Sequence, residues 1–407
     1  MRIVVIHSQS STGAYYLLSC FVDTISKYYP NIKISVFMTS YNDSYVDDGV
    51  LEPFVVNADD YIFKRKKYFH IKILDNLINH FRKKIFWQKN GTLDERINKN
   101  FDVAIYTWCY TMEPLALKIP NFFINHDMIM THFFGHHIVV AYSEEEANHT
   151  KKHIQKYIRY GCIPCFTTDF VRQDFLNLFP YYDGQTYVIL NMYNRHHKID
   201  IDKNKKVLEQ YDIPKDYIIY PINNMLHKNI GQGISGYFLA KQKYPNLKMI
   251  ITGYGLQKSK LKMDNPYYAT YIAEGEDYDI KLLGFVDDDI LTILISNARL
   301  LLNTSLCEAG CGSGLDAWIL GVPTAISNIP SYTEQVEKLG VKTEFFNPRN
   351  SDDIAQAILR ILDNPEKFKE NAEYSSNIIK QQHHYKNLAD EYVKIFNEQI
   401  NKKVLES

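Results

Sequence analysis

The sequence lacks three features that would each indicate a specialised class of protein. No apolar run reaches the length of about 18 residues that a membrane-spanning helix needs. The formal net charge is only −1, so the chain as a whole has no attraction to nucleic acid. Six cysteines among 407 residues are too few for a disulfide framework. What remains, with 45% hydrophobic and 23% charged residues, is an ordinary globular composition.

The start of the chain also lacks a targeting signal. Residues 3–6 are apolar, but the run ends at His7 and is too short for a signal peptide. We therefore expect a cytoplasmic protein with reduced thiols. Cys162 and Cys165 have no second pair at zinc spacing, so they are expected to be two free thiols. A chain of 407 residues is long enough for two domains.

The first part of the chain alternates strand patterns with helical patterns. Apolar runs at 2–6 and 33–38 flank a helical pattern at 16–29, an opening typical of a Rossmann-like domain. Further strand patterns lie at 103–106, 121–125, 138–142 and 187–190. The loop after the first run contains Gly13. We expect this loop to face a phosphate across a cleft, and an ordinary turn between strand and helix is the alternative.

Residues 61–89 are basic and aromatic, and Asp75 is their only acidic residue. Cationic clusters at 64–67 and 82–84 accompany apolar residues at helical spacing. Such a segment can lie on an anionic membrane surface, here the inner face of the membrane. The alternative is a solvated helix whose apolar stripe packs on its own domain.

Residues 299–334 carry the strongest functional signal, because they read as strand, loop, helix, turn and strand. Glycines between a strand and a helix let the backbone approach a ligand, and the helix N-terminus favours a phosphate. Glu308 precedes these glycines, and Asp316 is expected in the first helical turn. A carboxylate beside a phosphate is costly unless it binds hydroxyls or a cation, which predicts a sugar-bearing phosphate ligand. The predicted ligand-binding loop residues are Gly310, Gly312, Ser313 and Gly314.

Glu308, seven intervening residues, Asp316 and the following small residue and G-x-P at 321–323 resemble a known donor-binding motif. It is that of the large retaining glycosyltransferase family with the B-type fold (glycosyl transferases group 1, family 4-like). The family usually has Glu where Asp316 stands, which is a conservative departure. Its first glycine follows its first Glu directly, whereas Ala309 intervenes here.

The resemblance implies an α/β fold with two Rossmann-like domains that face a cleft (the GT-B fold). Residues 1–193 would bind the acceptor, and residues 217–384 would bind the nucleotide sugar. Residues 194–216, polar and charged at their start, would form the linker and the entry to the second domain. The final helix, within residues 385–407, would cross back onto the first domain.

Two further stretches resemble family loops that bind phosphate and base. His227 and Lys228 follow a strand pattern, as does the family's phosphate-binding lysine, and an ammonium is a compact charge suited to a diphosphate. Asn223 stands where the family often has an arginine, and a plain surface lysine is the alternative reading of Lys228. Gly253, Phe285 and Val286 also follow strand patterns. Gly253 is expected in a tight turn near the nucleotide, and the family holds the base at the turn of Phe285 and Val286.

Two stretches resemble metal signatures, and neither predicts a metal site. Residues 287–289 are three aspartates, and D-x-D binds metal in the other glycosyltransferase fold. Here they precede an apolar helical pattern, so they are expected to cap a helix. His126 and Asp127 end a strand pattern and resemble the family's acceptor-side loop, where a histidine lies near the transferred sugar; a loop histidine bonded to a neighbour is the alternative. No helical pattern brings His126 and the histidines after it to one face: His132, His136 and His137.

The resemblance implies a metal-independent retaining glycosyltransferase without a cofactor. It would move a hexose-type sugar from a nucleotide-diphosphate donor to a glycan, lipid-linked or protein-linked acceptor in cell-surface polysaccharide or glycoconjugate synthesis. Lys228 would stabilise the leaving diphosphate, Glu308 would contact the sugar, and Asp316 would hold the ribose. The alternatives are a nucleotide-sugar 2-epimerase of the same architecture and a catalytically silent nucleotide-sugar-binding protein.

Overall fold

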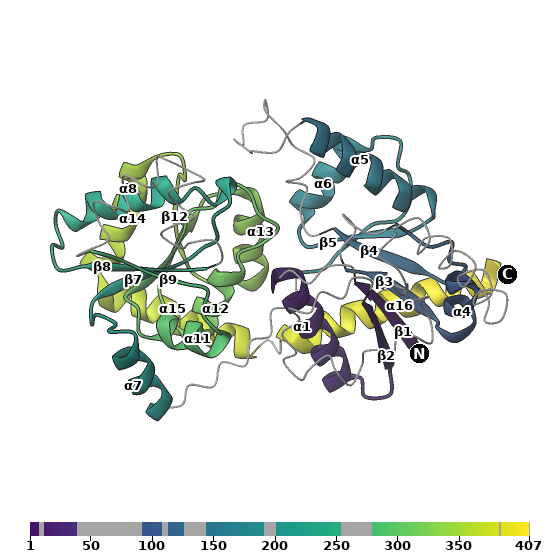
Figure 1. Cartoon of the computed structure of the whole chain (residues 1–407), viewed down its shortest axis with the longest axis horizontal. Helices are drawn as coiled ribbons and strands as arrows, with labels where there is room; N and C mark the ends of the chain where they lie inside the picture. Colours follow the sequence, from purple (N-terminus) through teal and green to yellow (C-terminus); the bar gives the residue numbers. More distant parts are fainter. Residues whose placement is uncertain are drawn as a thin grey trace, which may run out of the picture.

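The computed structural model describes residues 1–7, 12–38, 92–107, 113–125, 144–190, 201–253, 279–381 and 384–406. These residues form two domains that lie side by side, each built on a six-stranded sheet (Figure 1). Buried hydrophobic clusters lie on both faces of each sheet. The expected α/β fold with two Rossmann-like domains is therefore confirmed. No helix in these ranges is long and apolar enough to cross a membrane.

The N-terminal sheet has the strand order β2-β1-β3-β4-β5-β6, and all its described pairs are parallel. Its inner strands are short and almost entirely apolar, as strands covered on both faces must be. The elements are β1 (Arg2–His7), α1 (Thr12–Tyr28), β2 (Lys33–Met38), α4 (Leu93–Asn100), β3 (Val103–Tyr106), β4 (Asn121–Asn125), α5 (Glu144–Arg159), β5 (Ile163–Phe166), α6 (Asp169–Leu178) and β6 (Tyr187–Val188).

The C-terminal sheet has the order β12-β11-β10-β7-β8-β9, and it too is parallel. Its elements are α7 (Ile201–Gln210), β7 (Tyr217–Pro221), the 3-10 turn η3 (Leu226–Lys228), α8 (Ile230–Lys241), β8 (Lys248–Thr252), β9 (Ile280–Gly284), α11 (Asp288–Ser296), β10 (Leu300–Asn303), α12 (Gly312–Leu320), β11 (Thr324–Ser327), α13 (Pro330–Leu339), β12 (Glu344–Phe346), α14 (Ser351–Asp363) and α15 (Pro365–Gln381). The order of connection reverses between β7 and β10. Ligands of open α/β sheets bind at the carboxyl ends of the strands at such a point.

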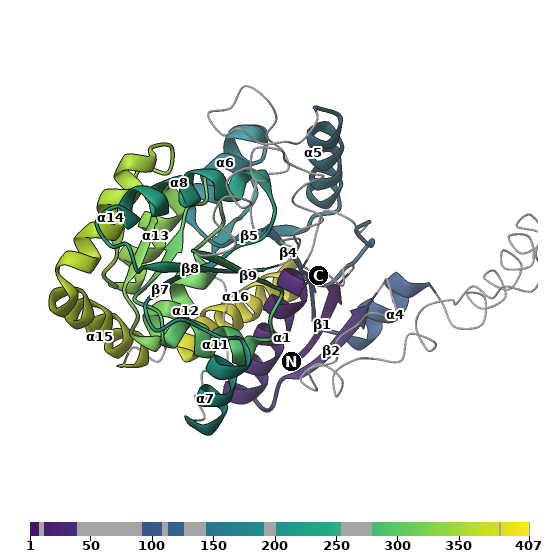
Figure 2. The ribbon, with the colours of Figure 1, turned by 60° about the vertical axis from the view of Figure 1, so that its left-hand side comes forward.

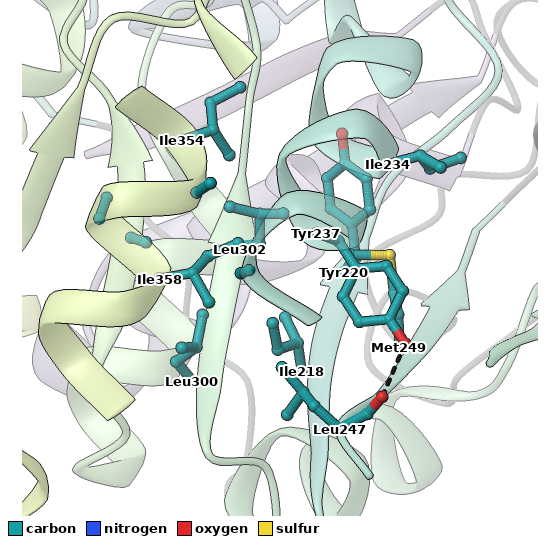
Figure 3. Close-up of a cluster of buried hydrophobic side chains, with 14 of the residues drawn as sticks. Ile218, Tyr220, Ile234, Tyr237, Leu247, Met249, Leu300, Leu302, Ile354 and Ile358 are labelled. Atoms are coloured by element: carbon teal, nitrogen blue, oxygen red, sulfur yellow. Dashed lines mark hydrogen bonds between the residues drawn. The ribbon is translucent and has the colours of Figure 1, made fainter. Parts of the chain in front are cut away.

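The core of the C-terminal domain anchors β7 behind this reversal point. Ile218 and Tyr220 of β7 point toward α8 and α14, where Ile234 and Ile358 belong to the same buried cluster (Figure 3). Tyr237 of α8 is fully buried, and its hydroxyl donates to the Leu247 carbonyl at 2.8 Å. The carboxyl end of β7 is thus anchored in the buried core behind the reversal point.

The last helix, α16 (His384–Glu406), belongs to the core of the N-terminal domain. Tyr392 packs edge-on against Phe21 of α1, and Phe396 packs against Phe122 of β4. Figures 1 and 2 show α16 beside α1 and beneath the N-terminal sheet. The predicted return of the final helix to the first domain is confirmed.

The predicted linker differs from the structure at one point. Residues 201–210 form α7, because Val207 is buried and the helix contacts α11. The predicted strand at 138–142 and the basic segment at 61–89 lie outside the described residues.

Candidate donor-binding site

A pocket of about 300 Å³ lies in the C-terminal domain, at the carboxyl ends of β7, β8, β9 and β10. It therefore occupies the reversal point of the sheet. The lining residues come from the loops that follow these strands and from α11, α12 and α13: Pro221, Ile222, Asn223, Lys228, Thr252, Gly253, Phe285, Val286, Asp288, Leu291, Asn303, Ser305, Glu308, Gly310, Gly312, Ser313, Asp316 and Tyr332.

Lys228 and Glu308 meet in this pocket as an ion pair. Their side chains are 21% and 15% exposed, so the pair is largely shielded from water. His227 lies beside it, with its Nε2 3.7 Å from the Glu308 carboxylate. The structure thus brings together three residues that the sequence singled out from two separate loops.

The protonation states of this group follow from burial and charge. Burial lowers the pKa of His227 to about 4, so its imidazole is neutral at pH 7. Burial alone would raise the pKa of the Glu308 carboxyl, but the Lys228 ammonium holds it below the usual value. Glu308 is therefore a carboxylate at neutral pH, and Lys228 is its cationic partner.

Asn229 fixes the loop that carries Lys228. Its backbone is left-handed, with φ of 59°, a conformation that Asn tolerates better than most residues. Its side-chain amide donates to the carbonyls of Thr304 at 3.2 Å and Pro348 at 2.6 Å. The Thr304 hydroxyl in turn donates to the Lys228 carbonyl at 3.0 Å. The lysine loop after β7 is therefore tied to the loop after β10, which carries Glu308.

Helix α12 begins at Gly312, four residues earlier than expected, and Asp316 consequently lies in the second turn. Asp316 lines the pocket but is only 4% exposed. Its carboxylate adds to burial in raising the pKa of Tyr385, near the start of α16. The helix starts early because Leu315 and Trp318 are buried, which outweighs the low helical propensity of the glycines.

Gly314 has a structural role that differs from the predicted contact with the donor. A Cβ at this position would lie 2.7 Å from the Cys311 sulfur and 3.4 Å from the Trp318 ring. Gly314 is also absent from the lining of the pocket, whereas Gly310, Gly312 and Ser313 are present. Its missing side chain lets Cys311 and Trp318 pack at the start of the helix.

Three polar residues that the sequence analysis missed shape the loop around Glu308. The Asn303 side chain accepts from the Ser305 amide and from the Tyr332 hydroxyl, each at 3.1 Å. Gln335 accepts from the Cys311 amide at 2.6 Å. A polar residue at the end of β10 was a detectable signal for Asn303. Nothing in the sequence indicated that Tyr332 and Gln335 of α13 would reach the same loop.

Gly253 lets two strand ends approach at the floor of the pocket. Its φ is 141°, and a Cβ there would lie 1.7 Å from the Ile222 carbonyl oxygen. The Gly253 amide donates to the Gly284 carbonyl at 2.7 Å, while Ile222 donates to Thr252 at the same distance. Only glycine fits this position, so the predicted turn has a steric reason.

Phe285 and Val286 also line the pocket. They follow β9, whereas Lys228 follows β7. Phe285 is 58% exposed, which leaves its ring available to a planar ligand. Asp287 is the N-cap of α11, and Asp288 and Asp289 lie in its first turn, as predicted. Within the described ranges no group of three or more His, Cys, Asp or Glu could hold a metal.

Two predicted site residues stay predictions. Gly13 lies in the first turn of α1 in the N-terminal domain. His126 lies outside the described residues. Cys162, Cys165, Cys307 and Cys311 are buried free thiols.

Comparison with known proteins agrees with this architecture. Residues 203–381 match the model of a family described as Glycosyl transferases group 1. A search of curated proteins gives no match. Two solved structures resemble the whole chain: Anabaena Alr3699/HepE in complex with UDP-glucose, at 16% identity and a TM-score of 0.69, and a glycosyltransferase from Rickettsia africae, at 14% and 0.66. Each alignment covers 98% of this chain. It covers 100% of the Anabaena protein and 98% of the Rickettsia protein.

A similar likeness holds for sucrose-phosphate synthase from Thermosynechococcus elongatus, with 12% identity, a TM-score of 0.65, and 99% of this chain and 100% of that one covered. The two-domain fold, with a pocket at the reversal point of its second sheet, is the B-type fold of the glycosyltransferases that this chain resembles. Residues 203–381 form a domain of the glycosyl transferases group 1 family.

Proposed function

We propose that this protein is a retaining glycosyltransferase that transfers a hexose-type sugar from a nucleotide-diphosphate donor. The observation that carries the proposal is the Lys228–Glu308 ion pair beside the glycine loop, at the reversal point of the sheet. A diphosphate suits the ammonium and the N-terminus of α12, and the exposed Phe285 ring suits a base. The similar protein Anabaena Alr3699/HepE, crystallised with UDP and with UDP-glucose, supports a donor of this class.

In the proposed reaction the bond between the anomeric carbon and the phosphate oxygen breaks, and a bond to the acceptor hydroxyl forms on the same face. The departing phosphate oxygen takes the acceptor proton, so the anomeric configuration is retained and no enzyme nucleophile is needed. Lys228 and the amides at the start of α12 stabilise the negative charge that develops on the leaving group. Glu308 binds sugar hydroxyls near the anomeric carbon, and Asp316 binds the ribose hydroxyls.

The acceptor is proposed to be a glycan, a lipid-linked saccharide or a protein-linked one, in cell-surface polysaccharide or glycoconjugate synthesis. The resemblance assigns the acceptor side to the N-terminal domain, with His126 near the transferred sugar. No metal or other cofactor takes part in the proposed chemistry.

Incubation with UDP- and GDP-sugars, followed by proton NMR, tests the proposal. Without acceptor, a transferase hydrolyses its donor slowly at most, whereas a 2-epimerase converts it to another nucleotide sugar. With a matching acceptor, the product should keep the anomeric configuration of the donor. Tight binding of a donor without turnover under either condition would identify a binding protein and contradict the proposal.

A further inference from the structure

The loop after Glu308 is held by hydrogen bonds from both domains. On the N-terminal side, the hydroxyl of Thr167 donates to the Ala309 carbonyl at 3.1 Å. On the C-terminal side, Gln335 of α13 accepts from the Cys311 amide at 2.6 Å. Gly310 lies between these two contacts and lines the pocket. The path of the loop therefore depends on both domains.

Thr167 belongs to the turn between β5 and α6, and it is 2% exposed. Its contact crosses 142 positions of the chain and ends on the residue next to Glu308. The Ala309–Gly310 peptide, one residue beyond Glu308, cannot rotate without losing this hydrogen bond. The N-terminal domain thus holds the residue next to the catalytic carboxylate proposed above, although none of its described residues lines the pocket.

A second contact holds the turn of Thr167 against the C-terminal domain. Glu334, the neighbour of Gln335 on α13, accepts from the backbone amides of Asp169 at 2.6 Å and Phe170 at 3.0 Å. These amides begin α6, where a carboxylate also complements the helix dipole. Figure 1 shows α13 on the side of its domain that faces the N-terminal domain, and α13 contacts α6.

Both domains provide acceptors for the free backbone amides at the N-terminus of α6. Within its own domain, Thr168 is the N-cap and accepts from the Val171 amide at 3.4 Å. The first two amides of the helix are satisfied by Glu334 from the other domain. These bonds exist only while the domains are together, so Glu334 makes the closed arrangement more favourable than an open one.

We propose that Thr167 is a positioning residue for Glu308, and that Glu334 is the interdomain latch that keeps Thr167 on the donor loop. The first part rests on the proposed function, since it assumes that Glu308 meets the donor. The second part concerns only the contact between the domains. Through this pair, closure of the acceptor domain sets the loop geometry that donor chemistry requires.

Thr167→Val tests the first part, because it keeps the shape of the side chain and removes the hydroxyl. We expect kcat to fall about tenfold, the effect of one hydrogen bond, with the donor KM changed by less than about twofold. Thr167→Ser keeps the hydroxyl and loses only the methyl group, so its kcat should be restored to near the wild-type value. If Thr167 acted by packing alone, the serine variant would not restore kcat. Unchanged kcat in Thr167→Val, or no rescue by serine, would overturn the positioning role.

Glu334→Ala tests the latch without any substrate. Hydrogen exchange should become at least about tenfold faster in the peptide that contains the Asp169 and Phe170 amides. The radius of gyration from X-ray scattering should also increase. A matched control on the same helix, Glu337→Gln, removes an exposed carboxylate and should leave both measurements unchanged.

The two kinds of failure are distinguishable. If Glu334→Ala exchanges like the wild type, the latch is wrong whatever the protein catalyses. If the wild type turns over no nucleotide sugar while Glu334→Ala does open the domains, the proposed function fails and the latch stands.

Discussion

Lys228 and Glu308 lie 80 positions apart in the chain, and their side chains form an ion pair within the pocket. One residue follows β7 and the other follows β10, and these strands are neighbours where the sheet reverses its order of connection. The fold itself therefore places the cation and the carboxylate together. A diphosphate that enters the pocket offers Lys228 a second anionic partner.

Lys228→Ala should lower turnover more than about a hundredfold, because one preorganised donor at a site of developing charge contributes about 3 kcal/mol. Steady-state kinetics at saturating donor measures this effect. Lys215→Ala, at an exposed lysine of the same domain, is the matched control. Circular dichroism must show that the variant is folded, since the substitution leaves Glu308 buried without its partner. Turnover near the wild-type value would remove Lys228 from the proposed mechanism.

Glu308→Gln should lower kcat strongly with little change in donor KM. A contact to the sugar that tightens as positive charge develops acts mainly in the transition state, so its loss appears in kcat. The measurement is a full donor titration at saturating acceptor. A change confined to donor affinity would mean that Glu308 binds the ground state only.

Asp316→Asn should show the opposite pattern, with a raised donor KM and a smaller change in kcat. A contact to ribose is equally strong in the ground and transition states, so its loss weakens binding uniformly. Because Asp316 is buried and its charge reaches Tyr385, thermal melting must accompany the kinetics. Tyr385→Phe is a useful comparison, because it changes the neighbour of Asp316 and leaves the carboxylate in the pocket. A fall in kcat without a change in KM would reverse the assigned roles.

Activity should survive incubation with EDTA, because the D-x-D sequence at 287–289 caps α11. Asp287→Asn should also retain activity, since Asn is as good an N-cap as Asp. Initial rates before and after EDTA, and after addition of Mg²⁺ or Mn²⁺, provide the measurement. Loss of activity that either ion restores would show that the chemistry needs a metal.

Stability should decrease as the pH falls from about 6.5 to about 4, in part because of His227. Its pKa is about 4 in the folded protein and about 6.5 in the unfolded chain, so the unfolded state binds more protons in this interval. Between pH 7.5 and pH 5 this residue alone should remove about 2 kcal/mol from the free energy of unfolding. Urea titrations of the wild type and of His227→Gln measure the difference. Equal pH dependence in both proteins would contradict a buried neutral His227.

Residues 61–89 are expected to bind anionic vesicles at low salt. Each Lys or Arg near an anionic surface contributes about 1 kcal/mol, so two clusters suffice for reversible binding. Salt should weaken the binding, because exposed charges are screened over about 10 Å at 0.1 M. Flotation with anionic and with neutral liposomes is the test. A protein that stays out of the anionic vesicles at low salt would favour the packed-helix alternative.

The elements that local pattern determines were predictable from the sequence. Buried parallel strands appear as short apolar runs, and β7, β10 and β11 were expected at or near their observed positions. Glu308 could be singled out because it precedes the glycines after such a run, and Lys228 because its loop after another such run resembles the family's phosphate-binding lysine loop. The packing of α16 on the first domain was expected from the family resemblance, since an amphipathic pattern does not say which domain covers it.

Contacts between distant segments were not predictable in the same way. Tyr332 and Gln335 reach the loop of Glu308 only because α13 packs beside it, and no local pattern encodes that approach. The residues of helix α7 were expected to be linker because their sequence is mostly polar and charged. The helix buries a single face, at Val207. The early start of α12 was missed because glycines in the first turn read as a loop, whereas packing of Trp318 decides the boundary.

Helix α16 has a consequence for how the chain reaches its native state during synthesis. Domains generally fold from the N-terminus as the ribosome releases them. Here the first domain buries Leu388, Tyr392 and Phe396 in its own core, and these residues are made after the whole second domain. Until the second domain has been translated, the nascent first domain therefore exposes the apolar face that α16 later covers. The first domain is therefore completed only after the second domain has been made. A truncation before residue 384, which removes α16, would destabilise the first domain more than the second.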